Sequence, residues 1–65
     1  MERNSRKLIR LLERHGWQLA DVRGDHHQFV HPSRKGRVTV PHPNADIPIG
    51  TLRSIYRQAG WLEKQ

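Results

Sequence analysis

The spacing of apolar residues changes twice along this chain, and this change constrains the fold more than any other feature. Between residues 8 and 12 the apolar side chains fall at i, i+1, i+3 and i+4, which predicts an amphipathic helix over residues 5–15. Residues 52–59 show a helical spacing again, which predicts a second helix that begins near Pro48 and ends at Gly60. The segment between these helices has the pattern of strands and turns.

The ends of the first helix carry recognisable signals. Ser5 is expected to be its N-cap, because a hydroxyl at that position accepts a hydrogen bond from a free backbone N–H. His15 lies in the last turn, where a cation is favoured, and Gly16 suits the left-handed position that ends a helix.

Three short strands are expected in the middle of the chain. They cover residues 17–22, 26–31 and 37–40, with a turn at 23–25, a hairpin loop at 32–36 and Pro41 as the stop. Pleat alternation places Leu19 and Val22 on opposite faces of the first strand.

Strands joined by short turns must be antiparallel, and the two amphipathic helices would cover one face of the sheet. The predicted fold is therefore α+β, with the order α-β-β-β-α and both helices packed on one face of a three-stranded antiparallel sheet. Trp61 and Leu62 are expected to fold back onto the core.

The length and the absence of cysteine limit how this fold is stabilised. Sixty-five residues form a single domain, residues 1–65, and a domain of this size buries only about 60% of the surface that its unfolded chain exposes. Without a disulfide, its stability must come from packing or from a partner. No apolar segment is long enough for a membrane span or a signal peptide, so we expect a cytoplasmic protein without membrane contact.

The chain is basic. Twelve Lys and Arg against six Asp and Glu give a net charge of +6. A polyanion is the expected partner, with nucleic acid as the first candidate and an acidic protein surface as the second.

Three histidines lie within six residues, at positions 26, 27 and 31. His26 and His27 point to opposite faces of a strand, while His27 and His31 share a face but lie roughly 13 Å apart along it. Zinc ligands lie about 2 Å from the ion, so a metal site would require the chain to bring His42 close. We therefore expect no metal site and no cofactor.

His26 differs from the other histidines in its expected position. If Phe29 packs under the helices, alternation places His26 on the open face of the sheet. A histidine there could give or take a proton near neutral pH, as the cleavage of RNA requires. The cations near it in the sequence could contact phosphates: Arg23, Arg34, Lys35 and Arg37. Taken alone, any one histidine is better explained as an ordinary strand residue that faces solvent.

Several short segments together resemble one known family. They are Gly16-Trp17, GDHHQF at 24–29, HP at 31–32, VTVPH at 38–42, GTLRSI at 50–55 and QAG at 58–60. The series is similar to that of the HicA toxin family, in the same order and over nearly the whole chain.

The resemblance implies a messenger-RNA interferase of a type II toxin–antitoxin system, with a fold like that of a double-stranded-RNA-binding domain. It further implies that a HicB-type antitoxin covers the active site. Operator DNA would be contacted only indirectly, mainly through that antitoxin.

The family's activity depends on a histidine in a Gly-Ser-His motif at the start of the second strand. By position this residue is His26, with His27 as the second choice. Asp25 stands where serine is usual; its carboxylate would favour a protonated histidine and repel an approaching phosphate. The expected RNA contacts are Arg23, Gly24, Arg34, Lys35 and Arg37. The expected activity is metal-independent endonucleolytic cleavage of mRNA.

Two other functions stay open at this point. The first is a non-catalytic module that binds structured RNA through a double-stranded-RNA-binding fold. Such domains commonly carry a lysine cluster at the start of their last helix, whereas residues 46–51 contain no lysine and one acid. The second is a subunit whose basic surface serves only to bind an acidic protein.

Overall fold

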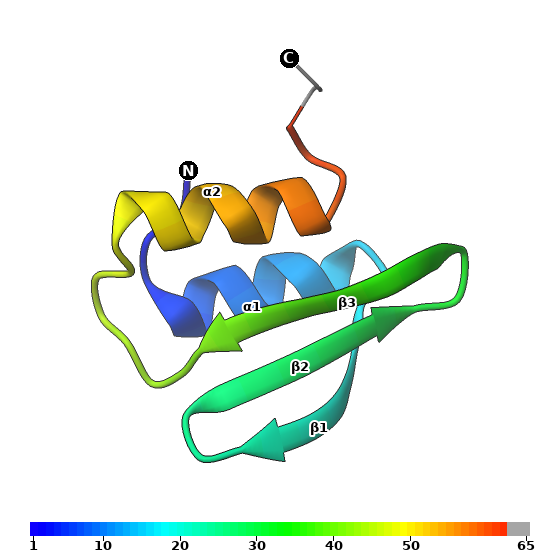
Figure 1. Cartoon of the computed structure of the whole chain (residues 1–65), viewed down its shortest axis with the longest axis horizontal. Coiled ribbons are helices and arrows are strands. Elements are labelled where there is room, and N and C mark those ends of the chain that lie inside the picture. The colour runs from blue at the N-terminus through cyan, green and yellow to red at the C-terminus, as the bar shows by residue number, and fades with distance from the viewer. Residues whose placement is uncertain (63–65) are drawn as a thin grey trace.

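The computed structural model describes residues 1–62 and has the predicted α-β-β-β-α order (Figure 1). The elements are α1 (Ser5–Arg14), β1 (Gln18–Arg23), β2 (His26–His31), β3 (Arg34–Pro41) and α2 (Ile49–Gln58). Residues 63–65 of the predicted domain lie outside the described residues. Within residues 1–62, no helix has the length and apolar character that crossing a membrane would require.

The sheet is antiparallel, with β2 in its centre and β1 and β3 at its edges. Phe29 of β2 lies opposite Leu19 of β1 and Val38 of β3, while His26 lies opposite Arg23 and Pro41. Directly opposed residues share a face of a sheet. The register therefore separates a helix-side face around Phe29 from an open face around His26.

Both helices contribute to one core on the Phe29 side of the sheet. The helical spacing of each element directs a single stripe of apolar side chains toward the strands. The buried core consists of Leu8, Leu12, Trp17, Phe29, Val38, Val40, Ile47, Leu52, Ile55 and Ala59. The α+β architecture predicted from the sequence is confirmed.

The start of α1 differs from the prediction. The N-cap is Asn4, whose side chain accepts a hydrogen bond from the Lys7 backbone N–H at 3.2 Å. Ser5 is instead the first helical residue, and it is buried. The prediction of Ser5 as the cap was wrong because Asn4 offers an equally good capping oxygen one residue earlier. The helix ends at Arg14, one residue before the predicted end, with His15 as its C-cap, and Gly16 has a φ of 92°.

The hairpin between β2 and β3 is tighter than predicted. His31 pairs with Arg34, so only Pro32 and Ser33 connect the strands, and β3 begins three residues earlier than expected. The run of Pro, Ser and Gly residues has the composition of a loop. Only Pro32 and Ser33 form the turn, whereas Arg34, Lys35 and Gly36 belong to β3, where the pairing with β2 shifts between Phe29 and His31.

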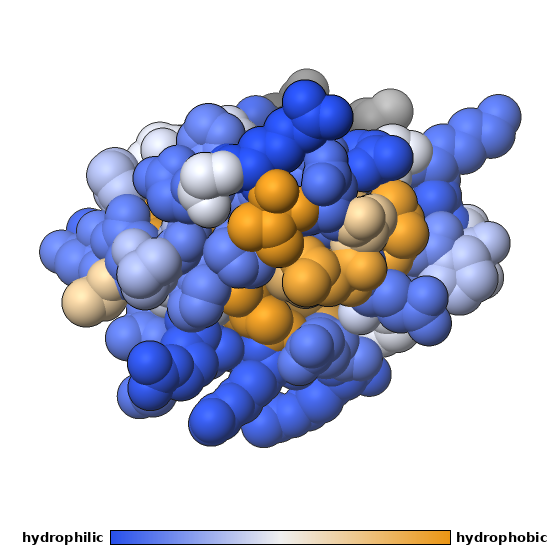
Figure 2. Space-filling model, turned by 90° about the horizontal axis from the view of Figure 1, so that it is seen from below, coloured by the Kyte–Doolittle hydropathy of each residue, from blue (hydrophilic) through white to orange (hydrophobic). Residues whose placement is uncertain are grey.

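β1 also departs from regular alternation. Its pairing with β2 shifts between Leu19 and Asp21, so Leu19 and Val22 both lie on the helix-side face, opposite Phe29 and His27. Leu19 is nevertheless 52% exposed and Val22 47% exposed, because β1 extends beyond the cover of the helices. Figure 2 views the molecule from the side on which β1 lies. Hydrophobic side chains gather near the middle of the molecular surface in this view.

Trp61, which follows α2, folds back onto the core as predicted. The Trp61 ring packs edge-on against Tyr56, with 5.1 Å between ring centroids, and lies 5.2 Å from the His15 ring. The Trp61 backbone N–H donates to the Tyr56 carbonyl at 2.8 Å. These contacts join the end of α2 to the end of α1.

Candidate active site

His26 is the first residue of β2, directly after the turn formed by Gly24 and Asp25. Gly24 has a φ of 58°, a left-handed conformation that glycine adopts without strain. The His26 side chain is 62% exposed, and its Nε2 lies 3.6 Å from an Asp25 carboxylate oxygen. The ring is therefore accessible to a large ligand on the open face of the sheet.

Arg23 and Arg37 lie on the same open face. Arg23 is directly opposite His26 in the register, and its Nε donates to the Asp21 carboxylate at 2.9 Å. This hydrogen bond is the main cause of a lowered pKa at Asp21. Arg37 donates to the Gln28 side-chain oxygen at 3.0 Å. A phosphate bound here would have to compete with Asp21 for Arg23.

The two cations at the start of β3 are directed to opposite sides. Strand alternation places Lys35 with Arg37 on the open face and Arg34 with Val38 on the helix side. The Arg34 guanidinium lies against Gly60, just beyond α2, where a cation meets the partial negative charge of the helix C-terminus. Arg34, one of the five expected RNA contacts, is therefore directed away from the open face that carries His26.

A second group of histidines lies on the helix-side face. The rings of His27 and His42 meet edge-to-face with 4.8 Å between centroids, so the chain does bring His42 to β2. His42 Nδ1 lies 2.7 Å from the Ser5 hydroxyl, which also accepts a hydrogen bond from the Asn44 backbone N–H at 2.8 Å. Within residues 1–62, no group of three His, Cys, Asp or Glu side chains is placed to hold a metal ion.

Burial lowers the pKa of His42 below its ordinary value of 6.5, and the charges of His27 and Arg6 lower it further. The folded protein therefore favours neutral His42, whereas the unfolded chain takes up a proton on it near pH 6.5. The free energy of unfolding should be highest above this pH and should fall as the pH drops toward the lowered pKa. Urea unfolding at about pH 7.5 and about pH 5 measures the decrease.

The variant His42→Gln should show a smaller loss of stability over the same pH interval, because residue 42 no longer titrates. An unchanged pH dependence in His42→Gln would show that His42 does not cause the effect.

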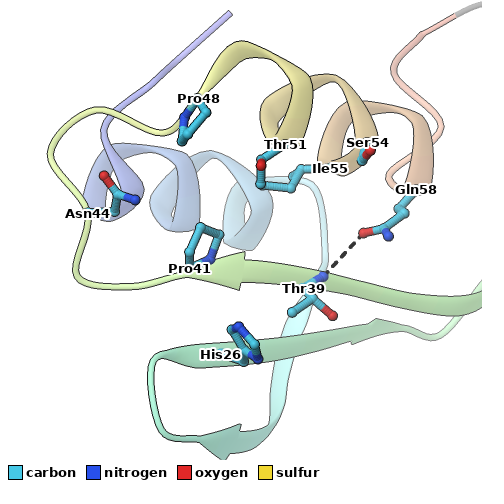
Figure 3. Close-up of a pocket in the computed structure, with 9 residues that line it drawn as sticks. All are labelled: His26, Thr39, Pro41, Asn44, Pro48, Thr51, Ser54, Ile55 and Gln58. Atoms are coloured by element: carbon cyan, nitrogen blue, oxygen red, sulfur yellow. Dashed lines mark hydrogen bonds between the residues drawn. The ribbon is translucent and has the colours of Figure 1, made fainter.

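A pocket of about 380 Å³ opens beside His26, between β3 and α2 (Figure 3). Its lining comes from β2, β3, the loop before α2 and α2 itself: His26, Thr39, Pro41, Asn44, Pro48, Thr51, Ser54, Ile55 and Gln58. The Gln58 side-chain oxygen accepts a hydrogen bond from the Thr39 backbone N–H at 3.3 Å. The four α2 side chains of this pocket were not among the predicted site residues; only their spacing of i, i+3, i+4 and i+7 along the chain could have indicated a shared helix face.

The fold and the site together define a small α+β domain with an exposed histidine at the start of its central strand. The family model described as the HicA toxin of bacterial toxin–antitoxin systems matches residues 5–61 of the 65-residue chain. The chain belongs to the HicA toxin family, as the resemblance of its segments predicted, and is thereby a toxin of a toxin–antitoxin system. A search of the curated proteins found no match.

Proposed function

We propose that this toxin is an endoribonuclease that cleaves mRNA without a metal ion, with His26 as its general acid or base. The observation that carries the proposal is the position of His26: its ring is exposed on the open face, directly opposite Arg23. Family membership supports the same activity.

The proposed reaction is an internal transfer of the phosphoryl group. The ribose 2′-oxygen attacks the neighbouring phosphorus, the bond from phosphorus to the 5′-oxygen breaks, and a 2′,3′-cyclic phosphate and a 5′-hydroxyl form. The 2′-hydroxyl loses one proton and the departing 5′-oxygen gains one. A neutral His26 could accept the first proton, and a protonated His26 could supply the second.

The cations of the open face would bind the RNA backbone. Guanidinium groups bind phosphates through paired hydrogen bonds, and they stabilise the charge that develops at phosphorus. Arg23 and Arg37 are the proposed phosphate contacts nearest His26, with Lys35 farther along β3. Gly24 would let the RNA backbone approach the turn, because apart from Gly24 and its two chain neighbours no atom lies within 4 Å of where a side chain would begin. Arg34 would contribute only if its side chain turned away from Gly60.

The direct test uses the purified protein and an end-labelled single-stranded RNA in the presence of EDTA. Shorter fragments that end in a 2′,3′-cyclic phosphate are expected. A complex with RNA that forms without any fragments would instead favour the non-catalytic RNA-binding module. Cleavage that requires added magnesium would refute the metal-free mechanism.

We further propose a HicB-type antitoxin as the protein partner, covering His26 and reaching the adjacent edge of the sheet. β1 is an edge strand with half-exposed Leu19 and Val22, and apolar side chains at such an edge favour the addition of a partner strand. The net charge of +6 favours an acidic partner. Contact with operator DNA would then be indirect, through the antitoxin.

Replacing both Leu19 and Val22 with serine is expected to weaken the complex with this antitoxin by about tenfold or more, because the apolar contact area is lost. The affinity of the purified proteins, measured by calorimetry, gives the result. Ile49→Ser is the matched control, since Ile49 is 49% exposed on α2, away from β1. Equal affinities for the double variant and the control would exclude this edge from the interface.

A further inference from the structure

We infer that the pocket between β3 and α2 binds one nucleobase of the RNA, and that Thr51, Ser54 and Gln58 determine which base is accepted. The inference rests on the proposed function, to which it adds a base-specific contact beside the cleaved bond. The pocket volume of about 380 Å³ is at the lower end of the roughly 300–1,000 Å³ that is typical of small-molecule sites. Such a volume suits a single nucleoside rather than a length of chain.

The chemistry of the lining favours a base over a phosphate. Pro41, Pro48 and Ile55 supply apolar surface, and the remaining side chains apart from His26 are neutral hydrogen-bonding groups. None of the lining residues, all of them within the described chain, carries a fixed charge. A phosphate group is held by cations, whereas an unstacked base needs apolar contact and hydrogen bonds to its edge.

The contact between Gln58 and Thr39 orients the amide that would read the base. Because the Gln58 oxygen accepts from the Thr39 N–H, the side-chain NH₂ group keeps its two donors for a ligand (Figure 3). Thr51 and Ser54 lie on the same face of α2, and each hydroxyl can donate or accept. This set of groups is suited to a base edge that presents acceptors to Gln58.

The position of the pocket links base binding to cleavage. His26 belongs to the pocket lining and also lies opposite Arg23 on the open face. A base held in the pocket would bring its own phosphate toward His26, while the rest of the chain continues along the open face. The identity of the base at one position next to the cut should then control the rate of cleavage.

The first experiment maps the cuts in an RNA of mixed sequence by sequencing the fragment ends. The unmodified protein is expected to prefer particular bases at one position beside the cut. Gln58→Glu keeps the oxygen that accepts from the Thr39 N–H but replaces the two N–H donors. The ratio of the cleavage rates at the preferred base and at the other bases should therefore change by about tenfold or more. Thr51→Val, which keeps Gln58 intact, should also change it. Gln18→Glu makes the same chemical change on β1, outside the pocket, and should leave the preference unaltered.

The second experiment detects binding without cleavage. The ¹⁵N-labelled protein is titrated with each of the four nucleoside 3′-monophosphates, and the Thr39 backbone and Gln58 side-chain amide signals are expected to shift. If these signals shift but no RNA is cut, the proposed nuclease fails and the base pocket stands. If RNA is cut, yet the signals do not move and both pocket variants keep the original preference, the base pocket is refuted and the nuclease stands.

Discussion

Replacement of His26 by alanine should lower the rate of RNA cleavage by about 10²–10⁴-fold, the usual contribution of general acid–base catalysis. The variant should fold normally, because the side chain is mostly exposed and lies outside the core. Cleavage of labelled RNA and growth of cells that express the toxin are the two measurements. Both should show the same loss of activity, while circular dichroism should be unchanged.

Two further variants distinguish catalysis from a general effect. His15→Ala removes an imidazole at the end of α1 and should retain full cleavage. His27→Gln tests the second candidate, whose ring lies on the helix side against His42. Near-normal cleavage by His26→Ala, together with a large loss in His27→Gln, would move the catalytic role to His27.

Replacement of Phe29 by alanine is expected to unfold most of the protein. Phe29 is in the central strand, is 1% exposed, and packs in the core shared by both helices. Truncating a buried phenylalanine costs about 3–5 kcal/mol. A domain of this size without disulfides has a total stability of roughly the same magnitude. Thermal and urea unfolding, followed by circular dichroism, measure the loss.

Phe29→Leu is the matched control, because it keeps most of the buried volume and should leave a cooperative unfolding transition. RNA cleavage by Phe29→Ala should be lost together with the folded structure, unlike that of His26→Ala. A cooperative transition of Phe29→Ala at nearly the original urea concentration would contradict the view that this one core supports the fold.

The elements and their order could be predicted because they depend on local periodicity. The apolar stripe at residues 8–12 and its counterpart at 52–59 define α1 and α2 wherever these segments pack. Alternation around Phe29 likewise predicted that His26 lies on the opposite face of the sheet from Phe29, and the register agrees. The expectation that this face is free of the helices was incomplete, because α2 side chains share a pocket with His26 beside β3. The start of β3 was missed because Pro32, Ser33 and Gly36 give residues 32–36 the composition of a loop, although the strand already begins at Arg34.

The amino-acid sequence by itself determined the family, the α-β-β-β-α order, the basic charge and the face on which His26 lies, because each depends on residue type or on local spacing. Only the tertiary structure decided which distant residues meet. It placed Ser5 against His42, Arg34 against Gly60, and the side chain of Gln58 beside Thr39 to shape the pocket next to His26. These contacts join segments far apart in the chain, and they depend on strand register and helix packing, which no local pattern specifies.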